Sequence, residues 1–200
     1  EMDVVFLMDR FGYSKTVDVS TYERNKEAAD AENKYILYTK NTGRVCLFTN
    51  KGQLYTIKVT DVPFGKFRDK GTPIDNISNY NSSQEEIVLI ASQSELNLYQ
   101  LIFVTKTGMM KLVDGGEFDV LKKSVSATKL LEQDEVLHVS VLKEIKQIVL
   151  QTKEGYFLRF PVEEIPVKKK TAVGVRGLKM TDKDYLEAVY FLQSGQDTVV

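Results

Sequence analysis

The side chains able to do chemistry in this 200-residue chain are mainly lysines and arginines, and they recur in clusters. Each cluster lies 12 to 18 residues after a glycine that sits in a polar turn. The turn glycines are Gly12, Gly52, Gly108 and Gly155, and the clusters that follow them are Arg24 and Lys26, then Lys66, Arg68 and Lys70, then Lys122 and Lys123, and then Lys168, Lys169 and Lys170. Cations repeated in this way suit a regular polyanion, and duplex DNA is the partner we expect.

The whole chain has a net charge of −1, so only the distribution of its basic residues indicates a polyanion. The glycine-rich segment 171–179 adds Arg176 and Lys179, and its glycines would let the backbone approach phosphate closely. Exposed loops are often rich in lysine, which is the simpler explanation of the clusters. The alternative function is therefore a protein-interaction propeller whose affinity for DNA is incidental.

Residues for enzymatic chemistry are scarce in this chain. Cys46 and His138 are single, so a His-dependent catalytic triad and a Cys/His zinc site are not expected. Both lie in alternating apolar runs, and we expect Cys46 to be buried and His138 to face solvent on a strand. The sequence therefore predicts no catalytic residue, no metal ligand and no cofactor within this chain.

The elements that must position the basic clusters are predicted to be β-strands, and the predicted fold class is all-β. Short apolar and β-branched runs flank each turn glycine, which is typical of β-hairpins. No segment of ten residues shows the 3.6-residue period of a long helix, and the polar segment 22–34 is predicted to be a loop or a short helix. No run is long enough for a membrane span, and the lone cysteine favours a cytoplasmic location.

The four turn glycines are 40, 56 and 47 residues apart. Periods of this length with several short strands each are typical of propeller blades. The first unit begins just ahead of its glycine, so we expect an incomplete first blade. In such a disc one phase of the repeat corresponds to one place on the rim, so the basic clusters would form a stripe around it.

The chain resembles the C-terminal domain of the A subunit of bacterial type IIA DNA topoisomerases, which are DNA gyrase and topoisomerase IV. The segments that carry the resemblance cover nearly the whole chain in the family's order: 11–15, 48–59, Pro63 with 70–74, 105–111 and 174–179. The resemblance implies one β-pinwheel domain over residues 1–200, cut from a longer chain. A β-pinwheel is a propeller-like disc of four-stranded blades that exchange strands, here about four blades, and whether the disc closes stays open.

The resemblance also implies a function. Duplex DNA would bend around the basic rim and present a segment for strand passage. The catalytic tyrosine would lie in another domain of the same polypeptide, and ATP and Mg²⁺ would serve the whole enzyme through its ATPase B subunit. Gyrase A subunits carry a Gln-Arg-Arg-Gly-Gly-Lys-Gly-like box after the first hairpin. Residues 24–30 here contain no glycine and two acids, which favours topoisomerase IV or a divergent relative over gyrase.

Overall fold

The computed structural model describes residues 1–193 of the chain. Strands dominate it, as the alternating apolar runs predict. The strands are β1 (Asp3–Asp9), β2 (Tyr13–Asp18), β3 (Asn33–Lys40), β4 (Arg44–Thr49), β5 (Gln53–Lys58), β6 (Thr72–Pro73), β7 (Ile87–Ser92), β8 (Gln100–Thr105), β9 (Met109–Asp114), β10 (Ser124–Ser126), β11 (Val136–Val141), β12 (Ile145–Thr152), β13 (Phe157–Pro161), β14 (Val175–Arg176) and β15 (Leu186–Gln193). The prediction of an all-β fold is confirmed.

Helices in the described residues are short. They are α1 (Val19–Arg24), α2 (Lys26–Glu32), α3 (Gln93–Leu96) and the 3-10 helices η1 (Val59–Asp61), η2 (Ile74–Asn76), η3 (Gly115–Phe118) and η4 (Val162–Glu164). The segment predicted to be a loop or short helix is thus two helices, and Asp18 caps the first by accepting a hydrogen bond from the Thr21 amide. Between residues 1 and 193 no helix is long and apolar enough to cross a membrane.

The strands form four antiparallel sheets. Their strand orders are β3-β1-β2-β6 in the first sheet, β10-β5-β4-β7 in the second, β11-β8-β9-β14 in the third and β13-β12-β15 in the fourth. Each sheet contains one of the predicted hairpins, and the four turn glycines all have positive φ, between 75° and 94°. Only glycine adopts this backbone conformation without steric cost, which is why the reversals occur there.

Neighbouring sheets exchange strands. The outer strand β6 of the first sheet follows the hairpin of the second sheet in sequence, and β10 and β14 repeat the same relation one and two sheets later. This is the exchange that the pinwheel resemblance implies.

The expectation of an incomplete first blade is wrong. Strand β6 completes the first sheet from far along the chain, since Thr72 lies opposite Ser14, 58 residues away in sequence, and Pro73 lies opposite Tyr13. Within residues 1–193 the smaller sheet is instead the fourth, which has three strands. A blade is therefore completed by the strand that the next repeat donates.

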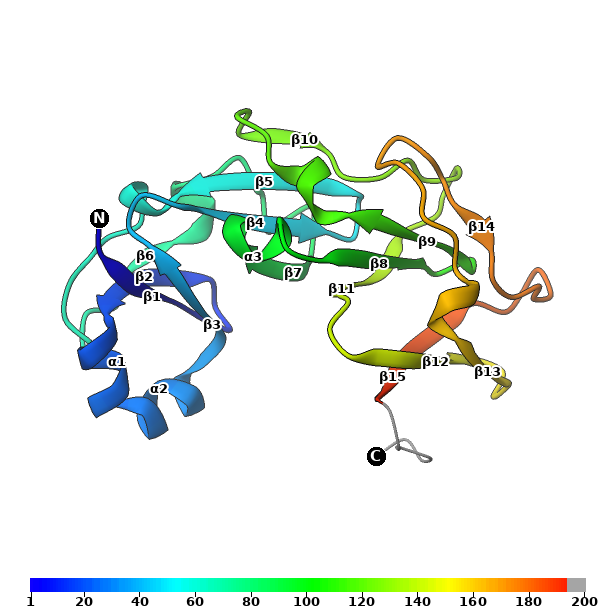
Figure 1. Cartoon of the computed structure of the whole chain (residues 1–200), viewed down its shortest axis with the longest axis horizontal. Helices are drawn as coiled ribbons and strands as arrows, with labels where there is room; N and C mark the ends of the chain where they lie inside the picture. The colour runs from blue at the N-terminus through cyan, green and yellow to red at the C-terminus, as the bar shows by residue number, and fades with distance from the viewer. Residues whose placement is uncertain (194–200) are drawn as a thin grey trace.

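The four sheets follow one another along an open arc, with the first and fourth sheets at its two ends (Figure 1). Strand β3 packs beside β7, β7 beside β11, and β11 beside β15, so one strand of each sheet lines the inner side of the arc. No comparable packing joins β15 to β3 in the described part of the chain.

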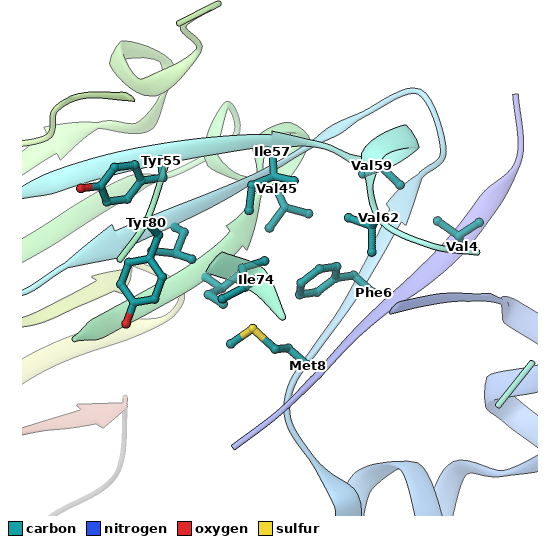
Figure 2. Close-up of a cluster of buried hydrophobic side chains, with 12 residues drawn as sticks. Val4, Phe6, Met8, Val45, Tyr55, Ile57, Val59, Val62, Ile74 and Tyr80 are labelled. Atoms are coloured by element: carbon teal, nitrogen blue, oxygen red, sulfur yellow. The ribbon is translucent and has the colours of Figure 1, made fainter. Parts of the chain in front are cut away.

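Each apolar core lies between two successive sheets. Phe6 and Met8 of β1 meet Val45 of β4 and Ile57 of β5 in the core between the first and second sheets (Figure 2). Corresponding clusters lie between the second and third sheets and between the third and fourth. The central strands are therefore buried on both faces, and burial of one phenylalanine side chain contributes about 1.5–3 kcal/mol.

Helices α1 and α2 cover the remaining face of the first sheet. Tyr22 of α1 and Ala29 of α2 are buried against Val5, Leu7 and Val17. The helices occupy the side of the sheet on which each later sheet has a preceding neighbour. They therefore cover an apolar face that would otherwise be exposed at this end of the arc.

The predictions for the single cysteine, Cys46, and the single histidine, His138, have different outcomes. Cys46 is fully buried, as predicted, and burial raises the pKa of its thiol to about 12. The prediction that His138 faces solvent is wrong. Its ring is half-buried with its centroid 5.2 Å from that of Phe191, because β11 packs beside β15, and burial lowers its pKa.

Candidate functional site

Three of the four basic clusters lie on equivalent connections. Each connection leaves a hairpin through a 3-10 helix, carries basic residues, and then supplies the outer strand of the preceding sheet. The connection that contains residues 66–70 leads from η1 to β6, that with 122–123 from η3 to β10, and that with 168–170 from η4 to β14. The common path places these clusters at the outer side of successive sheets.

Two of these connections agree in their backbone hydrogen bonds. The Thr16 amide donates to the Pro63 carbonyl at 2.8 Å, and the Leu112 amide donates to the Pro166 carbonyl at 2.9 Å. Gly71 and Gly174 end the two connections with φ of 85° and 104°. A Cβ atom at either glycine would lie within 2.5 Å of a backbone oxygen of the adjacent strand, so both positions require glycine.

The first of these connections presents three exposed cations, Lys66, Arg68 and Lys70. Asp69 organises its backbone, because its Oδ2 accepts a hydrogen bond from the Lys66 amide at 2.8 Å. The Lys70 ammonium lies 4.3 Å from the centre of the Tyr13 ring, which holds it above β2. These cations therefore lie together along the outer edge of the first sheet.

The second connection presents Lys122 and Lys123, and both side chains are exposed. Their carbonyls are fixed against β5: the Thr56 hydroxyl donates to the Lys122 carbonyl at 2.7 Å, and the Thr56 amide donates to the Lys123 carbonyl at 3.0 Å. The backbone is thus anchored while the two ammonium groups stay in solvent.

The third connection presents Lys168 and Lys169, which are exposed, whereas Lys170 is half-buried. The Lys170 ammonium donates to the Glu117 carbonyl at 3.0 Å, and the Lys170 amide donates to Glu117 Oε1 at 3.1 Å. Two of the three predicted lysines are therefore presented to solvent, and the third ties the connection to η3.

Arg176 and Lys179 are exposed but lie beyond this connection. Arg176 is on β14, and its guanidinium donates to the Thr107 carbonyl at 3.1 Å, close to the turn of the third hairpin. The glycine-rich segment thus serves as the donated strand, and its two cations extend the basic surface toward that turn.

Arg24 and Lys26 do not share the position of the other clusters. They lie where α1 ends and α2 begins, on helices that lead to the inner strand β3 rather than to an outer strand. Lys26 contacts Asp30 at 3.1 Å and the Tyr22 hydroxyl at 3.0 Å, and these hydrogen bonds raise its pKa. The expectation that all four clusters occupy one phase of the repeat is wrong for the first, because helices replace its connection.

Two lysines that the sequence-based prediction did not include lie beneath the basic connections. Lys15 and Lys111 each occur three residues after a turn glycine, and each donates hydrogen bonds from its ammonium to carbonyls of the connection above it. The signal in the sequence is a lysine within an otherwise apolar or β-prone run. Periodicity alone does not distinguish such a lysine from one that faces solvent.

Comparison with known proteins agrees with the fold described above. The model of the family described as "DNA gyrase C-terminal domain, beta-propeller" matches residues 43–91, 99–143 and 146–192. The DNA gyrase A subunit of Lawsonia intracellularis is 28% identical over 98% of this chain and 25% of its own length. That of Rickettsia conorii is 30% identical over 94% of this chain and 22% of its own length. The chain thus spans about a quarter of the length of these relatives.

Solved structures share the fold. The C-terminal domain of a DNA topoisomerase IV superposes with a TM-score of 0.85 at 24% identity, over 96% of this chain and 62% of that one. The C-terminal domain of E. coli ParC gives a TM-score of 0.77 at 16% identity, over 96% of this chain and 80% of that one. The family model covers more than half of the chain, and the chain therefore belongs to the DNA gyrase C-terminal domain family of β-propellers.

Proposed function

We propose that this chain is the DNA-binding and DNA-bending module of a type IIA topoisomerase. The observation that carries the proposal is the recurrence of basic connections at the outer sides of three successive sheets along an arc. Duplex DNA that follows these connections would have to bend with the arc. Such bending would present a segment of DNA for strand passage.

Binding through these connections would be independent of sequence. Their exposed cations are on loops, where they would meet phosphates, and the helices within residues 1–193 are all short. Each phosphate neutralised by a lysine or arginine releases a counterion, so affinity would fall steeply as salt is added. The net charge of −1 does not oppose this, because basic residues outnumber acidic ones within each outer connection, over residues 62–71, 119–123 and 165–174.

Of the two enzyme types, we propose topoisomerase IV. The relatives named above are gyrases and one superposed structure is a topoisomerase IV domain, so the choice rests on the segment after the first hairpin. The place of the gyrase box is occupied by α1 and α2, which carry the acidic residues Glu23, Glu27, Asp30 and Glu32. Acidic groups repel the DNA backbone, so this end of the arc favours a bend over a full wrap. A supercoiling-versus-decatenation assay on the whole enzyme would distinguish the two types.

The remaining chemistry of such an enzyme we assign to other parts of it. DNA cleavage would use a tyrosine of the A subunit outside this chain, and ATP hydrolysis with Mg²⁺ would belong to a B subunit. The proposed partners of this chain are duplex DNA and those two parts, and the proposed location is the cytoplasm.

The proposal predicts a loss of affinity when one connection is neutralised. Combining Lys66→Ala, Arg68→Ala and Lys70→Ala should weaken binding to a duplex of about 30 base pairs at low salt and reduce the magnitude of the salt slope by about 0.9 for each phosphate that is no longer neutralised. Fluorescence anisotropy at several salt concentrations measures both quantities. The combination of Lys168→Ala and Lys169→Ala should act in the same direction.

A matched control is available on the same chain. Lys34, Lys146 and Lys183 are exposed and lie outside the basic connections, so their combined replacement by alanine removes the same charge. We expect this control to change affinity much less. Equal losses in both triple variants would contradict a specific role of the connections.

The second candidate is a protein-interaction module, and one observation favours it. Large apolar side chains lie exposed beside the basic residues: Phe64 is 56% exposed, Leu121 90% and Val167 52%. Exposed apolar groups rimmed by charge mark many protein interfaces. Failure to bind duplex DNA together with retention of a defined protein partner in a pull-down would support this candidate over the first.

A further inference from the structure

Lys111 is a buried cation that lies under the third basic connection. Its side chain is on β9, and the residue is only 1% exposed. Its ammonium donates to the carbonyls of Lys169 at 2.9 Å, Lys170 at 3.2 Å and Ala172 at 2.6 Å. An ammonium has three N–H donors, and here three carbonyls of one short connection accept them.

Lys15 repeats this arrangement in the first sheet. It occupies the same place on β2, three residues after the turn glycine, and its ammonium donates to the carbonyls of Phe67 and of Asp69, the latter at 2.7 Å. Counted from Pro63 and Pro166, these two carbonyls correspond to those of Lys170 and Ala172. A lysine ammonium therefore binds the carbonyls of two connections whose sequences have little in common.

The second sheet lacks this device. Tyr55 takes the corresponding place, and its hydroxyl bonds Glu85 instead of a basic connection. The connection with Lys122 and Lys123 is held by Thr56 instead. The lysine is thus not required by the sheet itself, which can be built with another residue at this position.

We propose that Lys111 is a positioning residue that holds the third basic connection in the shape that presents Lys168 and Lys169 to DNA, and that it does so only while its ammonium is protonated. The inference rests on the proposed DNA-binding role of the connection, although the shape of the connection can be measured without DNA. The carbonyls are turned toward the buried ammonium, while the side chains of Lys168 and Lys169 stay exposed to solvent.

Loss of one proton would break this arrangement. A neutral amine keeps two N–H donors, so one of the three carbonyls loses its donor and faces a nitrogen lone pair. The Lys169 carbonyl also accepts from the Ala172 amide at 3.1 Å and the Ala172 carbonyl from the Thr128 hydroxyl at 3.4 Å, so the Lys170 carbonyl depends most on the ammonium. Losing a charged hydrogen bond at this point is unfavourable enough to reshape a short loop. The connection would then adopt another conformation.

Burial of Lys111 places this change near pH 8. Burial lowers the pKa of Lys111 to about 8, and the Glu117 carboxylate on η3 opposes that shift. Of the groups around it, the Phe103 ring on β8 has its centre 5.5 Å from the ammonium, and the ammonium of Lys170 is turned to the Glu117 carbonyl while Lys169 is exposed. Lys15 differs, because Glu32, Asp69 and Asp9 all counter the effect of its burial.

NMR of the whole chain without DNA tests the positioning role. The carbonyl carbon shifts of Lys169, Lys170 and Ala172 should move together with a common midpoint near pH 8. In the variant Lys111→Met, whose side chain has a similar length but no charge, this common transition should be absent. Wild-type shifts that stay constant across a pH range bracketing about 8 would overturn the proposal.

Duplex binding tests the consequence. Lys111→Met should weaken binding roughly tenfold at low salt and lower the salt slope by about 0.9 for each lysine that leaves the phosphates, whereas Lys146→Met should change neither noticeably. A normal affinity for Lys111→Met beside a weakened Lys168→Ala, Lys169→Ala variant would overturn it. If the carbonyl shifts titrate but no basic-loop variant affects binding, the proposed function fails and the positioning of the connection stands alone.

Discussion

The third and fourth sheets are built on equivalent hairpins but differ in what covers their outer strand. In the third sheet β14 pairs with β9, with Val175 opposite Met110. In the fourth, β13 has no such partner among residues 1–193. The residue two positions after the turn glycine differs accordingly in its exposure. In the third sheet this residue is Met110, which is 1% exposed, and in the fourth it is Phe157, which is 64% exposed.

This comparison shows that burial here depends on a donated strand rather than on the hydrophobicity of the hairpin. Ser14 and Leu54, at the same position in the first and second sheets, are both fully buried, and each of those sheets also has a donated outer strand. A serine is thus buried where a phenylalanine is exposed. The chain that crosses from the next sheet decides which residues join the core.

The largest expected effect comes from truncating this position. Met110→Ala should destabilise the fold by about 2–5 kcal/mol, because it leaves a cavity in the core between the third and fourth sheets. Phe157→Ala should change the free energy of unfolding by no more than about 0.5 kcal/mol, as is usual for exposed positions. Urea denaturation measures both. Similar losses of unfolding free energy in the two variants would contradict the difference in burial between the third and fourth sheets.

A smaller effect is expected at two glycines. Gly155→Ala meets no atom within 4 Å but keeps a φ of 94°, so it should cost about 1–2 kcal/mol. Gly174→Ala adds a Cβ only 2.5 Å from the Met110 carbonyl oxygen, and it should cost about 1 kcal/mol more. Denaturation midpoints of the two variants compare them directly. A milder effect at Gly174 would show that β14 can shift away from β9 without cost.

The smallest expected effect on stability concerns an ion-paired glutamate between two hairpin turns. Glu135 accepts from Lys51 at 2.7 Å and Lys106 at 2.8 Å and so joins the turns of the second and third hairpins. At the fourth turn the corresponding residue is Tyr185, with the Lys153 ammonium 5.4 Å from its ring centre. A carboxylate that titrates in acid is therefore replaced by an aromatic ring at the equivalent place.

The hydrogen bonds from Lys106 and Lys51 lower the pKa of Glu135 to about 2 from its ordinary value of 4.5. The stability that it contributes is therefore present above pH 4.5 and is lost as the pH falls toward 2. Glu135→Gln should flatten the acid side of the stability profile, while Glu163→Gln at an exposed position should not. Urea midpoints between these pH values measure the effect, and unchanged profiles in both variants would contradict it.

Much of the fold could be predicted from local sequence. Gly12, Gly52, Gly108 and Gly155 mark the hairpin turns because positive φ is a property of a single residue and its immediate neighbours. The basic clusters after the second, third and fourth hairpins could also be predicted, because the charge of a side chain is read directly from the sequence. Their role in binding DNA stays a prediction.

The site itself was predicted only in part. Lys111 lies in the run 109–113, where one lysine among apolar residues suggests an exposed position, yet both faces of this strand are covered. Arg24 and Lys26 match the other clusters in their distance from the turn glycine, but their helices lead to the inner strand β3 and not to an outer strand. Counting along the chain could not reveal either fact, because each depends on which sheet lies next to the segment.

By itself, the sequence determined the strands, their turns and the distribution of charge, because these follow from backbone preferences and side-chain types over a few residues. Only the tertiary structure decided which edges are covered, which lysines are buried and which cations share a surface. The pairing of Val175 with Met110 joins residues far apart in the chain, and no local preference specifies such a pair. Those contacts form because each sheet must cover its apolar faces with its neighbours, and that requirement belongs to the folded chain as a whole.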